Sequence, residues 1–297
     1  MVLGLGNSIV SGAALESAYV ATASWDFDGT NDHINLGNSS TIKLVPTDTS
    51  EGTGLTASCW MHADDWSGVS VQETFFSCEQ YGIDADDGKG WGMYRSDNTI
   101  VMVLDTTVAK YTLNAGWRPM ASSSNTQGTS PFWRSSGWHL FTMTFDGRYF
   151  RTYIDATAMA TASNTGADDT AIDYGSNQTN VDILLGADPS SLTSPDSGST
   201  WTPGTSLIGA PFEGMINEAA IWNKALDTDA IEEIFEAVNT DGAVLDLTKD
   251  SGDYDYSGNL VGLWRASDAS GTTAVDATGN NDGSIKNSTG TSTDVPS

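Results

Sequence analysis

The segment SWDFDGTNDHINLG, residues 24–37, places oxygen-bearing side chains between two stretches that read as half-buried strand. Asp28, Asn31 and Asp32 follow one another closely, with the turn former Gly29 among them. Carboxylate and amide oxygens of this kind bind hard cations such as Ca²⁺. The same residues also form ordinary hairpin turns, in which the side chains bond to their own backbone. The sequence therefore predicts either a turn or one side of a cation site.

Side chains that could carry out catalysis are not grouped. Glycoside hydrolysis needs two carboxylates that flank the scissile bond, yet Glu73 and Glu79 stand six residues apart with apolar and thiol side chains between them. The three histidines, His33, His62 and His139, show no mutual metal-ligand spacing. The sequence also lacks a Gly-x-Ser-x-Gly motif, a phosphate-binding loop and a Cys/His zinc pattern. We therefore predict that the protein is not an enzyme.

Composition narrows the classes of partner. The chain has 297 residues and a formal net charge of −27, and such a surface repels nucleic acid. No apolar stretch is long enough to span a membrane, so membrane insertion is not expected. The N-terminal stretch lacks the Lys or Arg that opens a secretory signal, and we interpret it as an arm. Cys59 and Cys78 are the only cysteines, which leaves one disulfide or two buried thiols.

The elements that must position these side chains are mostly strands. Alternation with a period of two recurs along the chain and indicates half-buried strands. One stretch, residues 226–239, is typical of a helix: Asp227 can cap it, and apolar side chains recur at three- and four-residue spacing. One short helix among about a dozen strands predicts an all-β sandwich. The strand-like segments are residues 56–63, 73–78, 91–96, 99–105, 138–147, 149–156, 181–187, 213–223 and 260–268.

Four motifs in order resemble a known family: WDFDGTNDHINLG, LTASCWMHAD, SSGWHLFTMTFDGRYFRTYIDA and FEGMINEAAIWNKALDTDAIEEIF. They are similar to the laminin-G-like, concanavalin A-like lectin and glucanase domains. The resemblance implies a jelly-roll sandwich of two antiparallel sheets with one short helix, over residues 24–287. An N-terminal docking arm, residues 1–23, would precede this domain, and a C-terminal polar tail, residues 288–297, would follow it.

The sequence departs from the family pattern in two places. Asn217 stands where the family usually has Asp, and residues 260–287 resemble the segment that commonly opens the domain although here they close it. The resemblance therefore places residues 260–285 against the N-terminal strand. It also implies a structural Ca²⁺ between the two segments, since related domains often hold a calcium ion. Its predicted ligands are Asp28, Asn31, Asp32, Asn280 and Asp282.

Tryptophans in or beside loops are candidates for sugar binding. Trp117, Trp133 and Trp201 fall outside clear strand alternation. Exposed aromatic rings on β-sandwiches stack on sugar faces, while Asp and Asn grip hydroxyl groups. The alternative, and the more common role for such residues, is that each tryptophan caps the core. The pattern predicts binding of cell-surface glycans only if these rings are exposed.

The opening MVLGLGNSIVSG, followed by this domain, resembles virion structural proteins of marine tailed phages that infect cyanobacteria. This resemblance implies a non-enzymatic component of the capsid surface or tail, on the outside of the virion. Residues 1–20 would dock it to other virion subunits, and the jelly roll would contact neighbours or host glycans. A free, extracellular carbohydrate-binding module is the alternative. A glycoside hydrolase is the third hypothesis, and the missing carboxylate pair counts against it.

Overall fold

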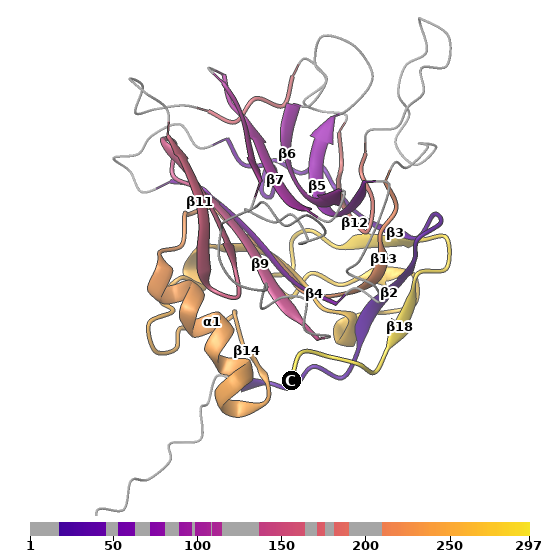
Figure 1. Cartoon of the computed structure of the whole chain (residues 1–297). Coiled ribbons are helices and arrows are strands. Elements are labelled where there is room, and N and C mark those ends of the chain that lie inside the picture. Colours follow the sequence, from indigo (N-terminus) through magenta and orange to yellow (C-terminus); the bar gives the residue numbers. More distant parts are fainter. Residues whose placement is uncertain are drawn as a thin grey trace, which may run out of the picture.

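The computed structural model describes residues 18–45, 53–62, 72–80, 89–96, 99–107, 109–114, 137–163, 171–175, 181–189 and 210–297. Over these residues the chain forms strands and a single α-helix, α1 (Figure 1). Two short 3₁₀ turns, Ser257–Asn259 and Ala266–Asp268, flank β15. The elements are β1 (Ala18–Tyr19), β2 (Ser24–Asp28), β3 (His33–Gly37), β4 (Leu55–His62), β5 (Glu73–Gln80), β6 (Lys89–Ser96), β7 (Thr99–Asp105), β8 (Lys110–Asn114), β9 (His139–Phe145), β10 (Tyr149–Ile154), β11 (Thr157–Ser163), β12 (Ile183–Leu185), β13 (Glu213–Trp222), α1 (Thr228–Asp241), β14 (Val244–Leu245), β15 (Leu260–Trp264), β16 (Thr273–Ala274), β17 (Gly283–Lys286) and β18 (Gly290–Ser292).

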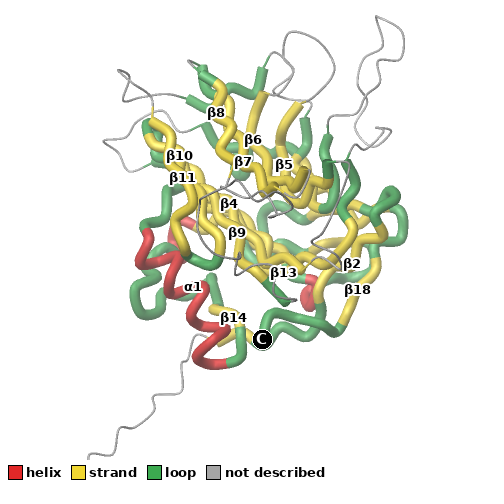
Figure 2. The backbone as a smooth tube through the Cα atoms, viewed as in Figure 1, coloured by secondary structure: helices red, strands yellow, loops and turns green. Residues whose placement is uncertain are grey.

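The strands form two large antiparallel sheets. Sheet I has eight strands: seven in the order β11-β10-β9-β4-β13-β2-β18, and β15, which also pairs with β13. Sheet II has eight strands in the order β16-β17-β3-β12-β5-β6-β7-β8. The tube view shows the strands gathered in these layers with α1 at one side (Figure 2). The predicted all-β jelly-roll sandwich with one short helix is confirmed.

Strand alternation divides the apolar side chains between two cores. On β4, Ala57, Cys59 and Met61 face the core between the sheets, whereas Trp60 belongs to a second core beneath α1. The central strands of sheet I are therefore buried on both faces, because α1 and β14 cover part of the side that sheet II does not. This explains why the burial pattern of β4 is almost continuous rather than alternating.

The helix α1 begins as its sequence predicts and extends two residues beyond the predicted stretch. Asp227 is the N-cap, and its carboxylate accepts a hydrogen bond of 2.9 Å from the backbone N–H of Ala230. Gly242 ends the helix in the left-handed conformation, with φ of 62°. Ile231, Ile234 and Val238 are buried against sheet I. The amphipathic stripe is thus the surface that docks the helix.

The two ends of the described chain lie side by side on the sheets. β17 pairs with β3, so the end of the segment 260–285 lies against an N-terminal strand as predicted, whereas its first strand, β15, pairs with β13. β18 pairs with β2. Residues 288–297, expected as a polar tail outside the domain, instead contribute β18 to sheet I. The sequence did not reveal this strand, because GTS carries no apolar side chain and is recruited by backbone pairing.

The segment predicted as an arm is partly built into the fold. β1 pairs with β14, and Ala21 is buried in the core beneath α1. Residues 1–17 lie outside the described residues. The described part of the chain contains no helix long and apolar enough to cross a membrane.

Both cysteines are free, buried thiols. Cys59 lies on β4 of sheet I and Cys78 on β5 of sheet II. Burial raises the pKa of each thiol, so both stay protonated. Of the two states that the sequence left open, the structure has the thiols.

Candidate functional site

The residues proposed as calcium ligands near the N-terminus form a turn. Asp28 ends β2, and its Oδ1 accepts hydrogen bonds from the backbone N–H groups of Thr30 and Asn31, at 2.8 and 3.4 Å. Asp32 is buried, and its Oδ1 has no hydrogen-bond partner. Burial, followed by the negative charge of Asp28, raises the pKa of Asp32. This environment disfavours the charged form of Asp32, which is the form that binds a cation.

The C-terminal residues of the proposed set lie in a second, separate turn. Asp282 Oδ1 accepts a hydrogen bond from the N–H of Asp276, and Asn280 donates to the carbonyl of Thr278. The antiparallel register pairs Lys286 with His33 and Ser284 with Asn35. Asp282 and Asp32 therefore stand at opposite ends of the β3–β17 pair, about 16 Å apart at about 3.3 Å per residue.

These five residues do not fit a single Ca²⁺. Ligand oxygens must lie about 2.3–2.6 Å from the ion, which residues at opposite ends of a strand pair cannot satisfy together. Over the described ranges, no three His, Cys, Asp or Glu side chains are grouped as metal ligands. The predicted ligand set fails because it was based only on the pairing of residues 260–285 with the N-terminal strand. The register of the pairing decides which ends of the two segments lie together.

The three tryptophans proposed for sugar binding, Trp117, Trp133 and Trp201, lie outside the described residues. The described chain instead offers a groove on the outer side of sheet I. It has a volume of about 480 Å³, and its lining residues include members of α1, of the start of β9 and of the β10–β11 turn. We call it the aromatic groove; its principal lining residues are Trp60, Trp138, His139, Asp155, Phe235 and Asn239.

Three aromatic side chains form the apolar part of the aromatic groove. Trp60, on β4, is buried and stacks on Phe235 of α1, with ring centroids 5.9 Å apart and planes at 19°. Phe235 and Trp138 are only partly buried. Trp138 precedes β9; its Nε1 donates a hydrogen bond of 3.0 Å to Asp294, and its ring packs on His62. Two accessible rings are therefore held in fixed orientations.

A polar pair lies beside these rings. His139 Nδ1 and the Oδ2 of Asp155 are 2.7 Å apart, and Asp155 Oδ1 accepts a hydrogen bond from the N–H of Leu140. Asp155 and Ala156 form the β10–β11 turn with φ of 49° and 58°, a conformation that costs energy for residues other than Gly. The turn thus places the carboxylate of Asp155 against the first two residues of β9.

The chemistry of the aromatic groove suits binding better than hydrolysis. Of its described lining residues, Asp155 alone has a carboxylate side chain. A glycosidase of the usual kind needs a second carboxylate across the scissile bond. Partly exposed rings beside hydrogen-bonding side chains are typical of a site that holds a ligand with both an apolar face and hydroxyl groups.

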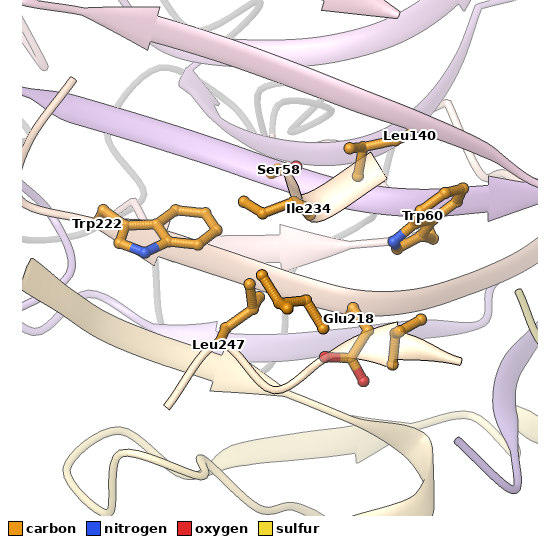
Figure 3. Close-up of a pocket in the computed structure, with 9 residues that line it drawn as sticks. Ser58, Trp60, Leu140, Glu218, Trp222, Ile234 and Leu247 are labelled. Atoms are coloured by element: carbon orange, nitrogen blue, oxygen red, sulfur yellow. The ribbon is translucent and has the colours of Figure 1, made fainter. Parts of the chain in front are cut away.

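A second, much smaller space lies between sheet I and the α1–β14 cover (Figure 3). Its volume is about 10 Å³, which is at most the room for one water molecule. Glu218 lies at its border, at a bulge in β13 where φ is 48°. The cavity is too small for an organic ligand. The notable feature of this region is the buried carboxyl group of Glu218 beside it.

Glu218 belongs to a buried ion network. Both of its carboxylate oxygens accept from Arg265 Nε, at 3.0 and 3.1 Å, and Arg265 also donates to Asp246 at 3.3 Å. Burial raises the pKa of Glu218 to about 7, although Arg265 opposes this. The ring of Tyr19 covers the guanidinium at 3.8 Å, and its hydroxyl donates to Asp268. The network therefore ties β1 to the body of the fold.

The departure at Asn217 has a structural reason in the same bulge. Asn217 Nδ2 donates a hydrogen bond of 3.2 Å to the carbonyl of Ala23, and its Oδ1 accepts from the N–H of Glu218. An ionised Asp could accept but could not donate to Ala23. The amide therefore joins β13 to the residue before β2.

The order of motifs, the two sheets and the helix agree with one family. The Laminin_G_3 family model, described as the concanavalin A-like lectin/glucanases superfamily, matches residues 28–232. The chain belongs to this superfamily. No curated protein sequence matches it.

Solved structures resemble this chain at low sequence identity, and the first of them has a TM-score above 0.5. A candidate carbohydrate binding protein from Bacteroides ovatus ATCC 8483 is 14% identical with a TM-score of 0.52, and the match covers 92% of this chain and 60% of that chain. The native heptameric SAP-like pentraxin from Limulus polyphemus is 12% identical with a TM-score of 0.43, over 74% of this chain and 84% of that chain. Domains LG4-5 of the mouse laminin alpha1 chain are 14% identical with a TM-score of 0.40, and the match covers 70% of this chain and 43% of that chain. This superfamily member thus spans 60% of the Bacteroides protein.

Proposed function

We propose that this superfamily member is a carbohydrate-binding module that holds its ligand in the aromatic groove. The observation that carries the proposal is the pairing of two partly exposed rings, Trp138 and Phe235, with the polar pair His139 and Asp155 in one groove. A volume of about 480 Å³ lies within the range of small-ligand sites, about 300–1,000 Å³.

Preorganisation supports this assignment. Trp138 is restrained by Asp294 and His62, and Phe235 is restrained by its stack on Trp60. A sugar ring that packs on these side chains therefore costs little additional side-chain entropy. The same restraint holds for the carboxylate of Asp155, which already accepts from Leu140. Hydroxyl groups of a ligand would meet polar atoms in fixed positions.

The test is binding to an array of immobilised glycans, followed by calorimetric titration with the oligosaccharides that bind. Trp138→Ala and Phe235→Ala should each weaken binding by about tenfold or more, as expected for aromatic anchors. Tyr149→Ala is the matched control, because Tyr149 is a partly buried aromatic residue of β10 that does not line the groove. Thermal unfolding of each variant separates lost binding from lost folding. Unchanged binding in both groove variants would refute the assignment of the site.

A role in a phage particle is a second candidate function, which the resemblance of the N-terminal segment implies. The observation that favours it is the anchoring of β1: Ala18 and Tyr19 pair with β14, and Tyr19 covers Arg265. A segment fixed at this point can transmit force from a docked arm to the sandwich. Deleting residues 1–17 should leave the thermal stability unchanged and abolish incorporation into particles. Normal incorporation of the truncated chain would exclude the docking role.

A further inference from the structure

The helical wall of the aromatic groove is acidic. The sequence of α1, TDAIEEIFEAVNTD, contains five Asp or Glu residues and no Lys or Arg. Glu232 and Glu236 are exposed and lie three residues before Phe235 and Asn239, respectively. Residues three apart share one face of a helix. The two carboxylates therefore flank the residues through which α1 lines the groove.

The remaining walls add no positive side chain. Among the described lining residues there is no Lys or Arg, and the imidazole of His139 is already paired with Asp155. Asp294, which holds Trp138 in place, adds a further exposed carboxylate at the rim. The whole chain contains 39 acidic residues and only 12 Lys and Arg residues. The electrostatic potential from the residues around the groove and that from the net charge of the chain are therefore both negative.

Acidic glycans need the opposite arrangement. Uronate, sialate and sulfate groups are bound by Arg or Lys, most strongly through paired hydrogen bonds. Glu232, Glu236 and Asp294 would instead repel a ligand carboxylate that lies beside them. At low salt this repulsion is little screened over distances shorter than the Debye length of about 10 Å. We propose that the aromatic groove selects glycans that carry no acidic group, namely neutral or amino sugars. This inference rests on the carbohydrate-binding function proposed above.

The experiment compares three oligosaccharides of equal length and β1,4 linkage: a neutral glucan, its amino-sugar counterpart and a mannuronate. Titration calorimetry of the full chain at low salt should show the mannuronate binding at least about tenfold more weakly than the neutral glucan. The difference should shrink when the salt concentration is raised to about 0.5 M, since salt screens exposed charges. The amino sugar should bind at least as tightly as the neutral one.

Matched variants distinguish the groove from the net charge. Glu232→Gln with Glu236→Gln should reduce the discrimination against mannuronate. Asp253→Asn with Asp255→Asn changes the net charge equally at exposed positions outside the groove and should leave the discrimination unchanged. Equal effects of the two pairs would contradict a local origin. Mannuronate binding as tight as the glucan would overturn the selectivity while leaving the carbohydrate-binding function standing, whereas no binding of any sugar by array or calorimetry would overturn both.

Discussion

Acidification should stabilise this protein through Glu218. Glu218 is 3% exposed, and its carboxyl group has a pKa of about 7 in the fold, against 4.5 for an unperturbed Glu, because burial disfavours its charged form. The folded state therefore binds this proton more tightly than the unfolded chain. The contribution to stability is fully present below pH 4.5 and is lost as the pH rises through about 7.

The magnitude follows from the two pKa values. A tenfold difference in proton affinity corresponds to about 1.4 kcal/mol, so Glu218 should add about 3 kcal/mol to the free energy of unfolding between neutral pH and the unfolded-state pKa. Asp246 acts in the opposite sense at lower pH. Although burial opposes it, hydrogen bonds from Lys249 and Thr248 and the charge of Arg265 lower its pKa to about 2. Stability from Asp246 is therefore lost as the pH falls from 3.8 towards 2.

The assay is urea unfolding followed by tryptophan fluorescence, at intervals from about pH 8 to about pH 5. Glu218→Gln keeps the shape of the side chain and removes its ionisation. Other titrating groups, including His33, are shared by both proteins, so the difference between their pH profiles isolates Glu218. The wild type should gain about 3 kcal/mol more than the variant over this interval. Parallel profiles would show that Glu218 ionises normally and would refute the reasoning from burial.

Three further predictions concern stability. Ala156→Gly should stabilise the fold by about 1 kcal/mol, measured by thermal unfolding, because φ of 58° is strained for Ala and not for Gly. Tyr19→Ala should cost about 1–2 kcal/mol through the lost contact with Arg265 and the lost hydrogen bond to Asp268, whereas Tyr19→Phe should cost less; equal losses would place the effect in the hydroxyl. Chelation with EDTA should leave the unfolding temperature unchanged, because the five proposed ligands do not converge; a lowered temperature would reveal an ion bound elsewhere.

Local signals in the sequence predict local structure well. The strand-like segments 138–147 and 149–156 form the β9–β10 hairpin, and Asp146 Oδ1 closes the turn between them by accepting from the N–H groups of Arg148 and Tyr149. The N-cap at Asp227 is likewise confirmed. These features depend on residues close in the chain, which interact in the same way in most contexts. Strands such as β18 depend on a partner far away in sequence and carry no such signal.

The proposed calcium site shows where local reasoning stops. Residues 276–283 were expected beside the N-terminal turn, and β17 does pair with β3. The direction and register of that pairing place Asp282 and Asp32 at opposite ends. Because one residue of slip moves a side chain to the other face of a sheet, register depends on packing that composition does not reveal.

The aromatic groove was missed for a related reason. Trp138 begins the strand-like segment 138–147, and Phe235 belongs to the apolar stripe of α1, so both read as core from the sequence. The angle at which α1 docks decides otherwise: Ile231, Ile234 and Val238 are buried against sheet I, while Phe235 lies at the edge of the stripe and stays partly exposed.

The docking of α1 on the sandwich therefore also determines the shape of the aromatic groove. Asp227 caps α1 and also accepts a hydrogen bond of 2.9 Å from the hydroxyl of Tyr256, which belongs to the core beneath the helix. The cap thus fixes the start of the helix to the sandwich, and Phe235 two turns later forms one wall of the groove. Because the polar pair of His139 and Asp155 is fixed independently by the β10–β11 turn, the two walls are positioned by separate parts of the fold. A change that loosens α1 should weaken ligand binding through Phe235 while leaving the His139–Asp155 pair intact.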